Sequence, residues 1–140
     1  MKKHTKKLIV AVLTVVMCLT SVPCFASETV DGISPRLSHM GSAAFSFAAY
    51  ESGGEAVISY EGYYASFVQA KATIKVEKRF LLVFWNDVDE WTATSTDVWG
   101  EFIHVFPLDG KGTYRATMTL EVTGTDGTVD VITDTIESTY

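Results

Sequence analysis

The chain has 140 residues, of which 47% are hydrophobic and 20% are charged, and its formal net charge is −6. This length is enough for one domain with a sizeable apolar core. The acidic balance argues against nucleic acid as a partner, because a net negative surface repels phosphate groups, and it favours cationic or neutral ligands such as glycans.

The first 26 residues have the layout of an export signal. Lysines concentrate in Met1–Lys7, the apolar run Leu8–Val22 follows, and Ala26 supplies a small residue just before Ser27. An apolar run of this length is shorter than the ~20 residues that span a bilayer as a helix. We therefore expect cleavage between Ala26 and Ser27, with no stable membrane insertion afterwards.

Loss of this segment would change both the charge and the cysteine content. Seven basic and all seventeen acidic residues would remain, which gives a net charge of −10. Both cysteines, Cys18 and Cys24, would leave with the signal, and neither follows the small residue that a lipid-modified cysteine requires. We expect a disulfide-free domain, held together by apolar burial and hydrogen bonds, that is secreted or loosely associated with the cell surface.

Residues 27–41 are polar and mixed, and we expect a flexible leader there. A single β-sandwich domain is expected over residues 42–140. Its first two strands are predicted at Ala43–Tyr50 and Glu55–Tyr63, which flank the turn signal Ser52-Gly53-Gly54.

Apolar and polar residues alternate through Val68–Glu77, which predicts a strand with one buried face. Phe80–Trp85 is apolar on both faces and predicts a central or interface strand, although a helix is also compatible with so short a run. Residues 86–90 form an expected acidic turn, and a polar loop is expected at 92–96. Trp99–Phe106 alternates again and predicts a further strand.

The last two strands are predicted at Thr113–Thr123 and Thr128–Glu137. The first of them alternates strictly, and the short Gly- and Asp-rich segment 124–127 between them predicts an antiparallel hairpin. Seven strands and no helix beyond the signal predict an all-β fold. The size matches an immunoglobulin-like antiparallel sandwich.

One local pattern supports that fold. Tyr114 follows the turn at Gly110 and begins a strand, as in a tyrosine corner, where the hydroxyl bonds back across the preceding turn. Ala116 occupies the position of the second cysteine of antibody domains. The alternative is that Tyr114 is simply a core aromatic residue of some other β fold.

Short motifs are spread over nearly the whole chain after the signal: Ile33-Ser34-Pro35-Arg36, Gly54-Glu55-Ala56, Val76-Glu77-Lys78 with Trp residues after it, and Gly112-Thr113-Tyr114-Arg115. In these motifs the chain resembles a group of small, uncharacterised secreted proteins of Gram-positive anaerobes that look like single immunoglobulin-like domains. The resemblance implies export and the sandwich fold, and it implies no activity. Phe80-Leu81-Leu82-Val83 departs from the polar turn expected at that place.

The sequence gives little support for catalysis. After the signal, the only histidines are His39, within the leader, and His104, expected to be a solvent-facing or edge residue of a strand. A catalytic triad needs a histidine oriented by a carboxylate, and the chain has neither Gly-x-Ser-x-Gly nor a mature cysteine. We therefore predict no catalytic residues, no cofactor and no enzymatic activity.

Asp87, Asp89 and Glu90 form the one acidic cluster of interest. Paired carboxylates could serve a glycosidase, and oxygen ligands on a loop could hold Ca²⁺, although the spacing does not fit an EF-hand. A solvated acidic turn is the plain alternative. Because Trp91 adjoins the cluster and precedes a polar stretch, these four residues are the predicted ligand-binding constellation.

Other aromatic side chains leave two interpretations open. They can form platforms for sugar rings or a protein interface, or they can pack in the core and at sheet edges. The residues concerned are Trp85, Trp91, Trp99, Tyr60, Tyr63 and Tyr64.

Together these observations predict a secreted, non-catalytic binding module whose partner is a cell-surface protein or glycan. A bacteriocin-like secreted toxin is one alternative, suggested by small size and export. A structural envelope component that self-associates through a free strand edge is another.

Overall fold

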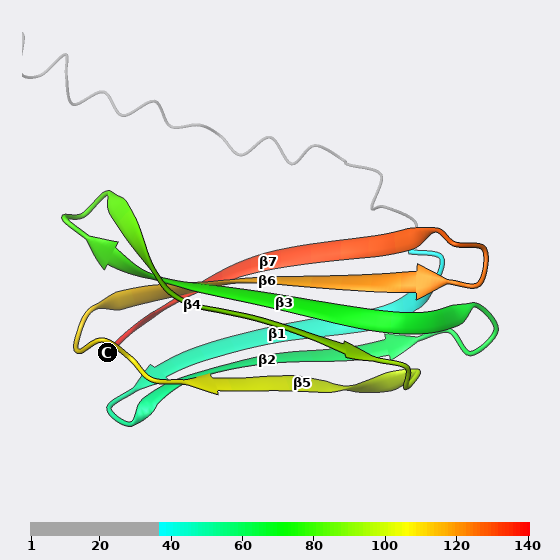
Figure 1. Ribbon diagram of the computed structural model, residues 1–140, viewed down its shortest axis with the longest axis horizontal. Coiled ribbons are helices and arrows are strands. Elements are labelled where there is room, and N and C mark those ends of the chain that lie inside the picture. Colours follow the sequence, from blue (N-terminus) through cyan, green and yellow to red (C-terminus); the bar gives the residue numbers. More distant parts are fainter. Residues whose placement is uncertain (1–36) are drawn as a thin grey trace, which may run out of the picture. The chain divides into compact units, whose positions relative to one another are not determined.

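The computed structural model describes residues 37–140, and in that range the chain forms seven strands and no helix (Figure 1). The strands are β1 (Met40–Tyr50), β2 (Gly53–Gly62), β3 (Phe67–Phe80), β4 (Phe84–Ser95), β5 (Trp99–Phe106), β6 (Thr113–Gly124) and β7 (Val129–Thr139). None of the described residues forms a helix long and apolar enough to cross a membrane. The predicted signal peptide (1–26), its cleavage position between Ala26 and Ser27, and most of the predicted leader lie outside the described residues.

The strands form two sheets that pack face to face. One sheet has the order β1-β2-β5 and the other has the order β4-β3-β6-β7, with every neighbouring pair antiparallel. In Figure 1 the two sheets lie one above the other along the length of the domain. The predicted all-β sandwich is therefore confirmed.

Alternation along each strand places the core between the sheets. On β6, Tyr114, Ala116, Met118, Leu120 and Val122 are fully buried, and the residues between them lie on the outer face. Ala56 and Ile58 of β2 and Phe102 and Phe106 of β5 are among the buried residues of the other sheet. Burial of this apolar surface is the main stabilising term for a domain without disulfides.

The alternation predicted for Val68–Glu77 holds except at its start. Ala70, Ala72, Ile74 and Val76 are buried, whereas Val68 is 45% exposed. A register shift between Phe67 and Gln69 against β6 turns Phe67 inward and Val68 outward. An extra residue in a strand reverses the facing of the residues beyond it, so strict alternation fails at that point.

The prediction for Phe80–Trp85 is wrong. This segment is the tip of the β3–β4 hairpin, with a turn at residues 81–83, and β4 then continues to Ser95. The acidic residues 86–90 and most of 92–96 therefore lie on a strand, where a turn and a loop were expected. Pairing of β3 with β6 ends at Lys78, so the tip extends past the sheet and has no partner to bury its apolar side chains.

The sandwich begins earlier than residue 42. β1 starts at Met40, and His39 and Met40 are both buried, so the end of the expected leader belongs to the domain. The Asp130 carboxylate accepts hydrogen bonds from the backbone N–H groups of His39 at 2.6 Å and Met40 at 3.1 Å. These bonds tie the start of β1 to β7 of the other sheet, and no local pattern in the sequence indicates them.

The loop between β5 and β6 contains the contact expected of a tyrosine corner. The Tyr114 hydroxyl donates to the backbone carbonyl of Gly110, and the Tyr114 ring is fully buried. Ala116 is also fully buried, at the inner face of β6. The Lys78 ammonium lies 5.6 Å from the centroid of the Tyr114 ring and covers this corner from β3.

Candidate functional site

The strand geometry of β4 divides the predicted ligand-binding constellation between two faces. Asp87 and Glu90 lie on the outer face of the four-stranded sheet, where they pair with Glu77 and Lys75 of β3. The Asp87 carboxylate lies 2.8 Å from the Lys75 ammonium, and this hydrogen bond raises the pKa of Lys75. Asp87 is therefore engaged in a surface ion pair, a contact that contributes little to stability.

Asp89 and Trp91 point the other way, toward β5. The Asp89 carboxylate contacts Nε2 of His104, and the His104 ring stacks on Trp91 at 4.9 Å between ring centroids with an interplanar angle of 9°. Trp91 also meets Phe102 edge-on, with 6.4 Å between centroids. Trp91 is thus a half-buried packing residue that joins the edges of the two sheets, and His104 is a partly buried residue between them.

The alternation of β4 separates Glu90 from Asp89 and Trp91, and a bulge places Asp87 on the same face as Glu90. Val76 pairs with Asp89 and Glu77 pairs with Asp87, so Val88 is the extra residue. Asp87, Asp89 and Glu90 consequently do not converge on one point. Among residues 37–140, no group of three or more His, Cys, Asp or Glu side chains is placed to hold a metal ion.

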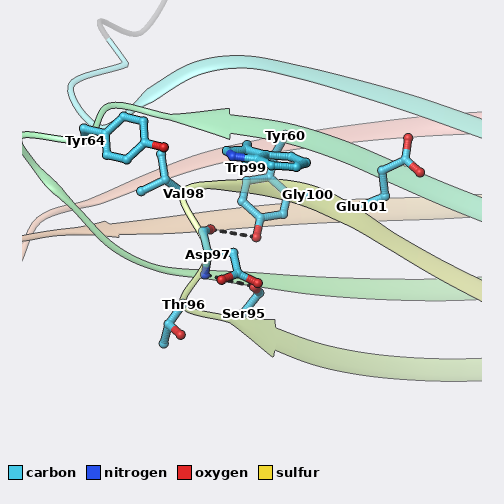
Figure 2. A pocket seen from close by; sticks show the side chains of 9 residues that line it. All are labelled: Tyr60, Tyr64, Ser95, Thr96, Asp97, Val98, Trp99, Gly100 and Glu101. Carbon is cyan, nitrogen blue, oxygen red and sulfur yellow. Dashed lines mark hydrogen bonds between the residues drawn. The ribbon is translucent and has the colours of Figure 1, made fainter.

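A different surface has the features of a binding site. At the end of the sandwich formed by the β4–β5 loop, a concavity of about 610 Å³ opens to solvent, and Figure 2 shows the side chains around it. It is lined by Tyr60, Tyr64, Ser95, Thr96, Asp97, Val98, Trp99, Gly100 and Glu101. We call it the Trp99 groove. Trp99 is 68% exposed and Tyr64 is 82% exposed, so both rings are free to meet a ligand.

Hydrogen bonds fix the floor of the Trp99 groove. The Tyr60 hydroxyl donates to the backbone carbonyl of Asp97 at 2.9 Å, and the Asp97 N–H donates to Ser95 Oγ at 3.1 Å, as the dashed lines in Figure 2 show. The Tyr60 ring is buried and stacks on Phe102 with 5.3 Å between centroids. The β4–β5 loop is thus held against the core, which pre-organises the groove for binding.

A second concavity of about 440 Å³ is also lined by Trp99. Its lining consists of Ser42, Ala43, Ala44, Ser59, Tyr60, Glu61 and Trp99. Tyr60 and Trp99 line both hollows, so the two hollows adjoin at these residues. Ser59 Oγ donates to the Glu101 carboxylate at 3.0 Å. This bond connects the lining of the second hollow, which includes Ser59, to that of the first, which includes Glu101.

The groove combines apolar ring faces with hydrogen-bond acceptors. Three carboxylates, those of Glu61, Asp97 and Glu101, line the two hollows, and no Lys or Arg does. Such a surface can stack against a flat apolar ligand face while its carboxylates accept hydrogen bonds from hydroxyl or ammonium groups. It would disfavour an anionic ligand.

Sequence reasoning named Trp99 among the aromatic candidates but favoured Trp91. On β5 the two alternating sets, Trp99, Ile103 and Val105 against Phe102, His104 and Phe106, are both largely apolar, so alternation alone does not say which set faces out. The first set proves to be outward. One usable signal was the neighbouring loop, since Thr96 and Asp97 precede Trp99 and mark it as the start of a strand at the domain surface.

No protein-family model matches the chain, and no curated protein or solved structure is significantly similar to it. The resemblance noted from the sequence motifs therefore stays a prediction, and any functional argument depends on the site itself.

Proposed function

We propose that this protein is a secreted, immunoglobulin-like β-sandwich that acts as a non-catalytic binding module, with a glycan as its ligand at the Trp99 groove. The immunoglobulin-like assignment is supported by the sheet order and by the Tyr114–Gly110 contact. The first, second and fifth strands share one sheet and the third, sixth and seventh share the other, as in constant-type domains. The fourth strand differs, because it borders β3 instead of joining the first sheet.

The observation that carries the proposal is the exposure of Trp99 and Tyr64 at an open groove lined with hydroxyl and carboxylate groups. Covering an indole that is exposed to this degree lowers the free energy of the complex, because apolar surface is removed from water. Sugar rings can provide the cover, since they present an apolar face beside a rim of hydroxyl donors. The carboxylates and the lack of lining cations favour neutral or amino-substituted sugars over uronic or sialic acids.

A non-catalytic role is favoured by the surroundings of His104. The other histidine of the described residues, His39, lies at the amino-terminal end of the domain. The His104 ring is held between Trp91 and Phe106, with 5.6 Å between the His104 and Phe106 centroids, and it does not line the groove. A histidine used as a general base must be within reach of a substrate proton. The ring contacts of His104 support a packing role instead.

Glycan-array screening followed by titration, with tryptophan fluorescence as the signal, tests the proposal. Trp99→Ala should weaken binding of the selected glycan by about tenfold or more, because it removes the ring that stacks on the sugar. Trp85→Ala is the matched control, since Trp85 lies at the other end of β4. Unchanged affinity in Trp99→Ala, or turnover of the bound glycan, would contradict a binding module at this groove.

Self-association has one supporting observation as a second candidate. β5 is an edge strand, and its outward residues Ile103 and Val105 are exposed beside Trp99. Edge strands with apolar side chains invite pairing with another chain. Sedimentation that stays monomeric at high concentration would remove this candidate. The toxin alternative rests on small size and export alone.

A further inference from the structure

The tip of the β3–β4 hairpin is a continuous run of exposed apolar residues. Five consecutive large apolar residues are each at least half exposed, from 52% to 86%, with the maximum at Leu82. They are Phe80, Leu81, Leu82, Val83 and Phe84. Figure 1 shows the hairpin projecting away from the sheets at one end of the sandwich. Monomeric proteins seldom expose a contiguous apolar cluster of this kind unless it serves an interaction.

The backbone of the tip is strained. Leu81 and Leu82 have φ values of 48° and 68°, in the left-handed region that bulky side chains disfavour. Asn and Gly adopt these angles readily and are the usual residues of tight hairpin turns. The chain keeps two leucines at positions where folding favours Asn-Gly. Such a conflict between local preference and structure is typical of a functional segment.

Behind the apolar tip lies a collar of arginine and tryptophan. The Trp85 ring contacts the guanidinium groups of Arg79 at 4.9 Å and Arg115 at 4.1 Å from its centroid. Arg79 pairs with Glu137 at 2.9 Å, and Arg115 pairs with Glu77 at 2.7 Å. From the apex of the hairpin back toward the sheet, the side chains are therefore first aliphatic, then phenyl, and then indole with guanidinium. Side chains follow this order with decreasing depth at a membrane interface.

Charge is distributed unequally between the two ends of the sandwich. Lys78 and Arg79 directly precede the tip, Lys111 lies with Asp109 in the adjacent β5–β6 loop, and Arg115 lies near the start of β6. The loops at the opposite end, residues 63–66, 96–98 and 125–128, contain Asp97 and Asp126 and no Lys or Arg. This arrangement gathers four of the six Lys and Arg residues of the described chain at the end of the sandwich that carries the apolar tip.

We propose that the Phe80–Phe84 tip inserts shallowly into a lipid bilayer, with Arg79 and Arg115 exchanging their carboxylate partners for lipid phosphate groups. A convex tip requires a complementary pocket in a protein partner, whereas a bilayer accepts it without one. A second copy of this chain offers a poor receptacle among its described residues, because each concavity has at least one carboxylate in its lining that an inserted apolar tip would desolvate. Insertion to the headgroup and acyl boundary requires no spanning segment.

This inference goes beyond the proposed glycan binding and does not depend on it. The tip and the Trp99 groove lie at opposite ends of β4, so a domain attached by its tip would present the groove away from the membrane. An experiment can therefore contradict one of the two proposals without contradicting the other. Trp99→Ala should leave vesicle binding unchanged, and a tip variant should leave glycan affinity unchanged.

Vesicle flotation of the full chain tests the proposal, with vesicles of phosphatidylcholine and phosphatidylglycerol. The double variant Leu81→Asn/Leu82→Gly should lower the partition coefficient by about tenfold or more, because two exposed leucines no longer enter the acyl region. The variant introduces the preferred turn residues, so it should fold at least as well, and circular dichroism checks this. Both proteins carry the same first 36 residues, whose own lipid affinity cancels in the comparison.

Quenching by lipids brominated on their acyl chains gives a second readout. Bound vesicles should quench the fluorescence of Trp85, so Trp85→Phe should remove most of the quenching and Trp99→Phe should remove little. Equal partition of the wild type and the double variant would overturn the proposal. So would a concentration-dependent dimer that the double variant abolishes while vesicle binding persists, because the tip would then be a contact between copies.

Discussion

The β6–β7 and β3–β4 hairpins of the four-stranded sheet have turns built from different residue types. The β6–β7 turn is closed by backbone bonds from the Gly124 N–H to the Thr128 carbonyl at 2.9 Å and from the Gly127 N–H to the Gly124 carbonyl at 3.0 Å. The Asp126 carboxylate accepts from both the N–H and the hydroxyl of Thr128, at 2.9 and 2.8 Å. Gly127 supplies the positive φ of 81°. Each residue type suits its place.

The β3–β4 turn has none of these turn-forming residue types. Within the turn the Val83 N–H donates to the Leu81 carbonyl at 2.8 Å, and leucines occupy both left-handed positions. Local preference and fold agree in one hairpin and conflict in the other. The comparison indicates that folding determines the β6–β7 turn, whereas the composition of the β3–β4 tip reflects a task outside folding.

The largest expected effect lies beside the β6–β7 turn, at Gly124. A Cβ there would collide with the His39 ring, which is buried and hydrogen-bonded through Nε2 to Thr128 Oγ1 at 2.7 Å. We expect Gly124→Ala to lower the free energy of unfolding by about 2–3 kcal/mol through overpacking. Urea denaturation measures the change.

Gly100→Ala is the matched control for that substitution. A Cβ at Gly100 would lie 3.4 Å from the Tyr60 hydroxyl, which is an ordinary contact. We expect a change below about 1 kcal/mol there. Similar losses in the two variants would mean that strand glycine itself, and not the close approach of His39, determines the cost.

At the other hairpin the expected change has the opposite sign. Leu81→Asn/Leu82→Gly should raise the free energy of unfolding by about 1–2 kcal/mol, because relief of two left-handed leucines outweighs the entropic cost of glycine. Thermal unfolding should show the midpoint rising by several degrees. Leu81→Ala/Leu82→Ala keeps the strained angles and should give no such gain. A destabilised Asn-Gly variant would show that the leucines contribute to folding.

A smaller loss is expected at the β6–β7 turn for Gly127→Ala. Nothing lies within 4 Å of the position that its Cβ would take, so the cost comes from the backbone angle alone. We expect about 1 kcal/mol of destabilisation in thermal or urea unfolding. Gly127→Asn should cost less, since Asn tolerates this region. Equal costs for both substitutions would point to a cause other than φ.

The smallest expected effect is a response to acid confined to one hairpin. Hydrogen bonds from the Thr128 backbone N–H and hydroxyl lower the pKa of Asp126 below its ordinary value of 3.8. The carboxylate therefore stabilises the turn above that value, and the contribution is lost as pH falls through the lowered pKa. The β3–β4 tip, residues 80–84, has no titratable group.

NMR titration of backbone amides from about pH 6 to about pH 2 should thus move the Thr128 resonance before that of Leu82. Asp126→Asn should remove the Thr128 transition. The carboxylate of Glu77, whose pKa is also lowered by its hydrogen bond with Arg115, provides an internal comparison on the outer face of the sheet. A simultaneous transition at both hairpins would indicate global acid unfolding instead of a local change.

The sequence predicted the sandwich fold, but it did not predict which way the four candidate site residues face. Asp87, Asp89, Glu90 and Trp91 are adjacent in the chain, but a bulge at Val88 and the alternation of β4 send them to opposite faces. Sequence adjacency implies a shared surface in a loop and separates neighbours on a strand. The expected acidic turn is a strand instead, and the predicted grouping of these four side chains depended on that turn.

The sequence by itself determined the all-β sandwich, most strand positions and the β6–β7 turn, because period-two alternation and turn chemistry are local properties. The predicted signal at residues 1–26 likewise rests on local composition. Tertiary structure alone decided that Phe80–Phe84 is an exposed tip and that Trp99 faces outward. An apolar run is buried only where a partner strand covers it, and pairing of β3 with β6 ends at Lys78. Local pattern carries no information about where that pairing stops.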